Sequence, residues 1–224
     1  VVKSGRHAQG AVAAQTHTGA LAGSDAVYDA AFRRAGLLRV LDLDELFAAA
    51  ETLGRLSPFP GNRLAILTNG GGVGVLAVDC LMDFGGNLAT ISPNVMKQLD
   101  AALPPIWSKA NPIDISGDAD AHRYAAALEP LLTDPANDAV LVMNVPTALA
   151  SAADAANAVI NVVRAHRSSI HPSKPVFSVW IGDSGEASAK LEAAGIPHYP
   201  SESDAVCGFM HLVRYREAHD TLMA

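Results

Sequence analysis

The hydrophobic positions of the chain follow two patterns, short continuous apolar runs and longer segments with helical spacing. Continuous runs such as Ala139-Val-Leu-Val-Met143 are typical of strands that are buried on both faces. The runs predict strands at 63–68, 87–91, 138–144 and 175–181, each followed by a helix, at 72–84, 93–102, 151–166 and 184–194, and a last helix at 202–219. This alternation predicts an α/β fold, a doubly wound, flavodoxin-like or Rossmann-like parallel sheet.

The residues before this alternation predict a small α/β lobe. We expect a helix over 25–35 ended by Gly36, a short strand at 37–40, and a helix capped by Asp42 that turns Leu43, Leu46, Phe47 and Ala50 inward. The run 57–62 holds two prolines and a glycine and interrupts both patterns. The expected domains are therefore residues 1–57 and residues 61–224. Because the chain starts abruptly in what reads as the end of a strand, we expect it to be part of a longer protein.

Composition limits the classes of partner. The net charge is −7 and no long basic run is present, which argues against nucleic acid. The two cysteines, Cys80 and Cys207, lie in predicted helices with apolar neighbours, so we expect buried thiols and no disulfide. The sequence shows no signal peptide and no apolar run of the roughly 20 residues that span a bilayer, so we expect a cytoplasmic protein without membrane contact.

A glycine-rich turn follows the strand at 63–68. It reads Asn69-Gly70-Gly71-Gly72-Val73-Gly74 and opens a helix. Glycines let the backbone approach a ligand closely, and the first amides of a helix attract anions, so the turn predicts a phosphate-binding site. It is not a Walker A loop, because no Lys-Ser or Lys-Thr pair follows. The alternative is a turn that only allows close packing of strand and helix.

His17 lies among small residues in the run 15–25, which we expect to form a loop before a helix. A neutral imidazole with small neighbours is a competent nucleophile for a phosphoryl group. The alternative is a loop histidine near a helix start. No histidine shows metal-ligand spacing with cysteines or carboxylates, so we expect no metal site.

The segment 103–118 holds three prolines and Trp107, and we expect it to be ordered. Its Asn111 and Asp114 have two interpretations. They satisfy backbone groups in a structural crossover, or they form a wall of the phosphate or CoA site.

Several motifs together resemble one known family. Lys3-Ser-Gly-Arg6 and the run 16–32 are similar to the phosphohistidine segment of NDP-forming acyl-CoA synthetases, which are relatives of succinyl-CoA synthetase. The resemblance continues through 68–72, through Asn111-Pro-Ile-Asp114 and through 194–199. It covers nearly the whole chain, with the motifs in the family's order.

The resemblance implies an ADP-forming ligase that joins an acid to CoA at the expense of ATP. His17 would carry the phosphoryl group, and Asn69, Gly70, Gly71, Gly72, Val73 and Gly74 would form one of two helix starts that stabilise it. The other helix start, a CoA-binding domain, an ATP-grasp domain and a glutamate that orients the histidine would lie outside these residues. CoA, phosphate and ATP or ADP with Mg²⁺ would be ligands of the full-length protein, and the resemblance assigns no bound cofactor to this chain alone. The acid is not predicted.

A second class of function stays open. Related proteins join the same module to a GNAT domain and act as protein lysine acetyltransferases, in which the module is regulatory. The runs 107–112 and 209–216 look most like that branch. A third alternative is a module that senses CoA thioesters without turnover.

Overall fold

A computed structural model describes residues 1–18, 23–169 and 173–223. Contacts between residues divide the chain into two compact units. One unit comprises Val1–Pro58 together with His211–Ala224, and the other comprises Phe59–Met210. The division assigns the end of the last helix to the same unit as the N-terminal residues, whereas the sequence pattern placed it in the second domain.

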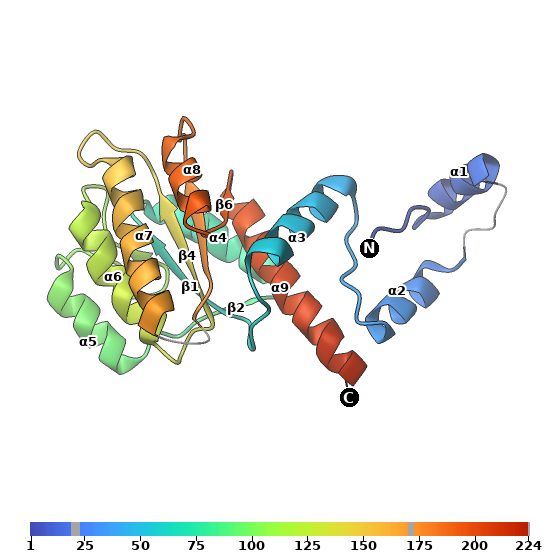
Figure 1. Ribbon diagram of the computed structural model, residues 1–224, viewed down its shortest axis with the longest axis horizontal. Coiled ribbons are helices and arrows are strands. Elements are labelled where there is room, and N and C mark those ends of the chain that lie inside the picture. The colour runs from blue at the N-terminus through green and yellow to red at the C-terminus, as the bar shows by residue number, and fades with distance from the viewer. Residues whose placement is uncertain (19–22, 170–172, 224) are drawn as a thin grey trace. The chain divides into compact units, whose positions relative to one another are not determined.

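The larger unit is built on a parallel sheet (Figure 1). Its strands are β1 (Arg63–Thr68), β2 (Asn87–Leu88), β3 (Ile113–Asp114), β4 (Ala139–Asn144), β5 (Val176–Trp180) and β6 (His198–Tyr199). The order is β2-β1-β4-β5-β6, and β3 pairs with the last two residues of β1. This is the flavodoxin-like order, in which the chain moves first to one side of β1 and then to the other. The predicted fold class is confirmed.

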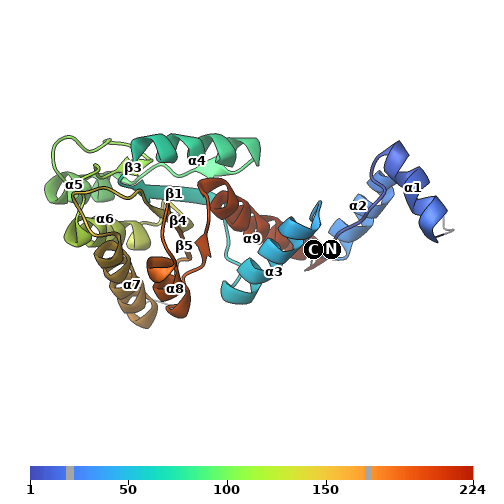
Figure 2. The same ribbon diagram turned by 90° about the horizontal axis from the view of Figure 1, so that it is seen from above.

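Helices cover both faces of the sheet, as expected from the continuous apolar strands. They are α4 (Gly71–Asp83), α5 (Pro93–Ala102), α6 (Ala121–Thr133), α7 (Ala152–Ser169), α8 (Glu186–Ala193) and α9 (Glu202–Met223). Figure 2 shows α4 on one side of the sheet and α6, α7 and α8 on the other. Alternate strand residues serve the two layers, because Val140 joins the core cluster under α5–α8 while Phe177 meets Phe209 of α9 edge to face.

Three elements of this unit were missed by the sequence pattern, and one was overextended. The helix α6 was missed, and it carries Pro130 in its interior, where proline normally ends a helix. The strands β3 and β6 have only two residues each, too few to show a hydrophobic period. The predicted strand at 87–91 pairs only over Asn87–Leu88.

The smaller unit is mainly helical. It contains α1 (Ala8–Thr18), α2 (Asp25–Arg34), α3 (Leu43–Arg55) and the part of α9 from His211 onward. The short strand expected at 37–40 is reduced to one parallel bridge between Val2 and Val40. A small cluster of Leu38, Val40 and Ala49 forms its core.

The inward face of α3 differs from the prediction. Asp42 caps the helix as expected, accepting a hydrogen bond from the Glu45 amide at 2.7 Å. However, Ala49 and Thr52 are the buried residues, whereas Phe47 is 70% exposed and Leu43 is exposed too. Leu46 is half-buried and packs against the unit's core, as predicted, whereas Ala50 is exposed.

No helix among the described residues is long and apolar enough to cross a membrane. Cys80 and Cys207 form no disulfide, as expected, but both side chains are half-buried, not buried.

Candidate functional site

The candidate site lies at the carboxyl end of β1, where the sheet order reverses between β1 and β4. The side chain of Asn69 spans the two strands there. Its Oδ1 accepts a hydrogen bond from the Val145 amide at 2.7 Å, and its Nδ2 donates to the Val145 carbonyl at 2.9 Å. In doubly wound sheets this reversal point is where ligands bind.

The start of α4 faces this point without a side-chain cap. Gly70 occupies the N-cap position, and the first hydrogen bond within the helix runs from the Gly74 amide to the Gly70 carbonyl at 3.1 Å. The amides of Gly71, Gly72 and Val73 therefore have no acceptor within the helix. Such amides, together with the positive end of the helix dipole, favour an anion.

The other helices that follow strands in this unit begin differently. Side chains of Ser92, Asp120, Ser151, Asp183 and Ser201 accept hydrogen bonds from first-turn amides of α5, α6, α7, α8 and α9, respectively. Burial tends to raise the pKa of Asp183, but hydrogen bonds from Ser188, Ala187 and Gly185 outweigh it and lower that pKa to about 2. The α8 start thus already holds a carboxylate that accepts from its amides, whereas Gly70 supplies no side-chain acceptor to the α4 amides.

Three of the four glycines of the turn have close neighbours, whereas a Cβ on Gly72 would meet nothing within 4 Å. A Cβ on Gly70 would lie 2.5 Å from Val145 Cγ2, and a Cβ on Gly71 would lie 2.5 Å from Asp114 Oδ2. A Cβ on Gly74 would meet Thr68 and Pro112, each at 3.1 Å. Close packing of strand and helix therefore explains Gly70 and Gly74, while Gly71 makes room for a carboxylate at the helix start.

The segment 103–118 is ordered, as expected from Trp107. The Trp107 side chain is 2% exposed, and its Nε1 donates to Asp100 at 3.0 Å. At the far end of the segment, Asp114 Oδ1 accepts from the Ser116 amide at 2.9 Å, which holds the carboxylate beside Gly71. Asp114 thus contributes a negative charge next to the α4 amides.

Asn111 is built into the sheet. Its Oδ1 accepts from the Ile66 amide at 2.9 Å, and its Nδ2 donates to the carbonyls of Leu64 and Ala89 at 3.0 and 2.9 Å. The side chain replaces the strand partner that β1 lacks between β2 and β3. This geometry matches the structural interpretation of Asn111, since these three side-chain hydrogen bonds all go to backbone groups.

His17 lies in the last turn of α1 and is exposed. The expected loop is therefore helical up to Thr18, because residues 8–15 are mainly alanine and glutamine, which favour helix. The rest of the predicted loop, residues 19–22, lies outside the described residues. The imidazole is accessible, as a phosphoryl carrier must be.

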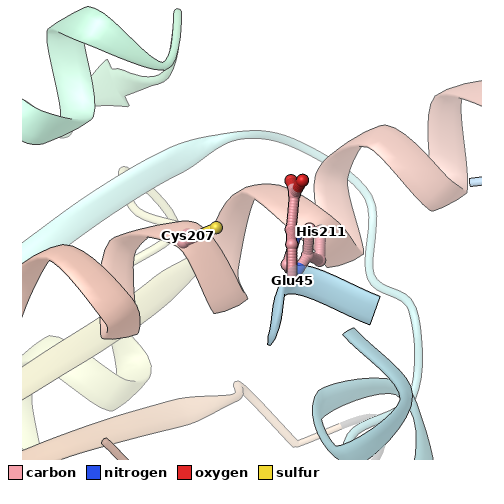
Figure 3. Close-up of side chains that lie close together, drawn as sticks. All are labelled: Glu45, Cys207 and His211. Atoms are coloured by element: carbon pink, nitrogen blue, oxygen red, sulfur yellow. The ribbon is translucent and has the colours of Figure 1, made fainter. Parts of the chain in front are cut away.

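A further polar pair of the smaller unit was not singled out from the sequence. His211 Nε2 and Glu45 Oε1 lie 3.2 Å apart, and the His211 side chain has no exposed surface (Figure 3). Burial lowers the pKa of His211, and Glu45 opposes that shift. The signal available in the sequence was Glu45, three residues after the Asp42 cap, where a carboxylate commonly reaches back to the helix start. Here it binds the Leu41 amide and His211.

Fold and site together define an α/β protein of the flavodoxin-like type with an uncapped helix start at its switch point. Comparison with known families narrows this class. Residues 1–53 match the succinyl-CoA ligase-like flavodoxin domain, and residues 64–221 match the Ligase-CoA domain. The chain belongs to the NDP-forming acyl-CoA synthetase family, and the predicted resemblance is confirmed.

Relatives with curated functions are ligases. The chain is 36% identical over 217 residues to the alpha subunit of ADP-forming acetate–CoA ligase I from Pyrococcus furiosus, covering 96% of this chain and 46% of the relative. It is 37% identical to ADP-forming acetate–CoA ligase I from Archaeoglobus fulgidus, covering 96% of this chain and 30% of that protein. The chain thus spans less than half the length of these relatives.

A solved structure shares the fold. The dinucleotide-forming acetyl-coenzyme A synthetase 1 of Ca. Korarchaeum cryptofilum, in complex with phosphate and ADP, aligns with a TM-score of 0.90 at 32% identity. The alignment covers 100% of this chain and 48% of that one.

Proposed function

We propose that these residues are the phosphoryl-relay part of an ADP-forming acyl-CoA synthetase, which converts an acid, CoA and ATP to an acyl-CoA, ADP and phosphate. The observation that carries the proposal is the uncapped start of α4 at the switch point, in a chain of this family. Phosphate and ADP in the structure of the Korarchaeum relative support it.

The relay splits the reaction into steps that balance. In the direction of ATP formation, phosphate attacks the acyl-CoA carbonyl, the C–S bond breaks and CoA leaves with an acyl phosphate formed. A ring nitrogen of His17 then attacks phosphorus, the P–O bond to the acyl group breaks and the free acid leaves. ADP finally takes the phosphoryl group from nitrogen, which restores His17.

The chain's own residues have two tasks in this scheme. His17, exposed at the end of α1, is the nucleophile. The amides of Gly71, Gly72 and Val73 stabilise the phosphoryl group, whose negative charge they attract without reorganisation. CoA, the nucleotide with its Mg²⁺ and the acid would be bound largely by parts of the longer relatives that this chain does not span, and those parts would be its partners.

Phosphorylation of His17 tests the proposal. The full-length protein is incubated with γ-labelled ATP and Mg²⁺, and acid-labile, base-stable label is expected on the peptide that contains His17. His7→Ala serves as the control, because it removes another exposed histidine of the same unit and should leave the label. Label that persists in His17→Ala would remove the residue from the relay. CoA-thioester binding without label would favour the regulatory module of a GNAT acetyltransferase or a sensing module.

A further inference from the structure

Tyr124 of α6 carries a buried hydroxyl with two partners. The hydroxyl donates to the Met143 carbonyl at 3.0 Å and accepts from Asn144 Nδ2 at 3.0 Å. One side chain on α6 therefore holds the last two residues of β4, directly before Val145, whose backbone binds the Asn69 side chain.

The Tyr124 hydroxyl lies where the pairing of β1 with β4 ends. Thr68 and Met143 are the last paired residues of β1 and β4. Beyond that pair the Asn69 side chain joins the two strand ends, and the Tyr124 hydroxyl holds the end of β4 beside it. Asn69 immediately precedes the Gly70 N-cap, so its position sets the direction of the α4 amides.

Packing alone does not account for the hydroxyl. The Tyr124 ring belongs to the core cluster and lies 6.4 Å from the Trp180 ring, contacts that a phenylalanine would keep. A buried hydroxyl costs free energy unless it is hydrogen-bonded. Burial raises the pKa of Tyr124 above its ordinary value of 10, so the phenol keeps its proton and donates at neutral pH.

Asn144 shows that this network is not arranged for stability alone. The residue is 5% exposed, its Nδ2 donates to Tyr124, and its buried Oδ1 has no hydrogen-bond partner among the described residues. An unpaired buried acceptor is normally avoided. It persists here at the strand end next to the candidate site.

We propose that Tyr124 is a positioning residue of the anion site: its hydroxyl fixes the end of β4, where Val145 binds Asn69, and thereby aims the Gly71–Val73 amides at the bound phosphoryl group. The inference rests on the proposed function, because it assigns a role in the same site. Tyr124 would not touch the phosphoryl group itself.

Inorganic phosphate and backbone-amide NMR test this inference on the 224-residue chain. Phosphate is titrated against the wild-type chain, Tyr124→Phe and the control Tyr199→Phe, which removes a buried phenol hydroxyl from β6, two strands away from β4. Shifts of the Gly71, Gly72 and Val73 amides give the dissociation constant. Thermal unfolding of each variant reports on folding.

The expected result is a phosphate dissociation constant about tenfold higher in Tyr124→Phe, with wild-type affinity in Tyr199→Phe. Equal affinity in Tyr124→Phe and the wild type would overturn the inference and leave the proposed function standing. A wild-type chain without phosphate-dependent shifts at α4 would overturn the anion site itself. Should Tyr124→Phe fail to fold, Asn144→Ala removes one partner of the hydroxyl and is expected to weaken phosphate binding in the same direction.

Discussion

Asn69 and Val145 are joined by two hydrogen bonds, one in each direction, between the amide group of the former and the backbone of the latter. The Asn69 side-chain amide thus continues the hydrogen bonding between β1 and β4 by one residue after the paired strands have ended. This arrangement leaves the backbone of the following residues free to turn into α4.

Gly71→Val is expected to lower turnover of the full-length protein by about 10²–10³-fold, as much as the loss of one preorganised donor, because the added side chain would keep the phosphoryl group from the α4 amides. The new Cβ would meet Asp114 Oδ2, which belongs to the end of a side chain and can shift, so folding should change little. Steady-state kinetics and thermal unfolding measure the two effects. Gly54→Ala is the control, because a Cβ there meets nothing within 4 Å. A wild-type rate in Gly71→Val would contradict the proposed anion site at the start of α4.

Asp114→Asn is expected to strengthen phosphate binding about tenfold, because it removes a negative charge that lies beside the α4 amides. The variant should also lose about 0.3–1 kcal/mol of folding free energy, since a carboxylate stabilises a helix start. Phosphate titration followed by amide shifts gives the affinity. Asp118→Asn changes the net charge equally in the same segment, where Asp118 pairs with Arg123, and should leave the affinity unchanged. Weaker binding in Asp114→Asn would instead make Asp114 a phosphate contact.

Asn111→Ala is expected to lower the free energy of unfolding by about 2–4 kcal/mol, because each buried backbone group left unpaired costs about 1–3 kcal/mol. Denaturant unfolding measures this loss. The exposed Asn87, whose Nδ2 donates to Asn62 Oδ1, supplies the control, and Asn87→Ala should change stability by less than about 0.5 kcal/mol. A loss of activity without a loss of stability in Asn111→Ala would favour the site-wall interpretation.

Some features of the fold and of the candidate site could be predicted from the sequence, and others could not. The continuous apolar runs of β1, β4 and β5 and the glycines after β1 were sufficient to predict the parallel sheet and the location of the α4 start. By contrast, the partners of Asn111 and Tyr124 are backbone groups far away along the chain, and a hydrophobic pattern contains no information about them. The helical state of His17 was missed because small residues were interpreted as a loop, although alanine favours helix.

The folding stability of the larger unit is expected to fall as the pH decreases from 7 to 5, in part because of His166. Burial, Lys174 and Arg167 lower the pKa of His166, so the unfolded chain binds a proton more readily than the folded one. The contribution is present above the unfolded pKa of about 6.5 and is lost as the pH falls toward the folded pKa. Protonation of Nε2 would also break its hydrogen bond from the Lys174 amide. Denaturant unfolding of His166→Gln at several pH values should show a smaller slope than the wild type, and an identical slope would contradict the assignment.

Amides of residues 7–18 are expected to exchange with solvent much faster than those of β1 and β4. Residues of α1 are exposed or half-buried wherever their side chains are described, and an isolated helix of 11 residues is marginal in water. Hydrogen exchange followed by NMR measures this difference. Protection of α1 equal to that of β4 would show that the helix is anchored.

We also expect the 224 residues alone to unfold cooperatively in their larger unit and to show no ATP or CoA-thioester turnover.

The missing cap of α4 makes helix order and anion occupancy linked equilibria. Without an anion, the first turn of α4 contributes less to the stability of the domain than the starts of its neighbours do, since Gly70 offers its amides no side-chain acceptor. An anion that binds only the folded helix start would raise the free energy of unfolding by RT ln(1 + [L]/Kd). The melting temperature of the domain would therefore rise with anion concentration, and the ligand would restore the stability given up at Gly70 according to the logarithm of its concentration relative to Kd.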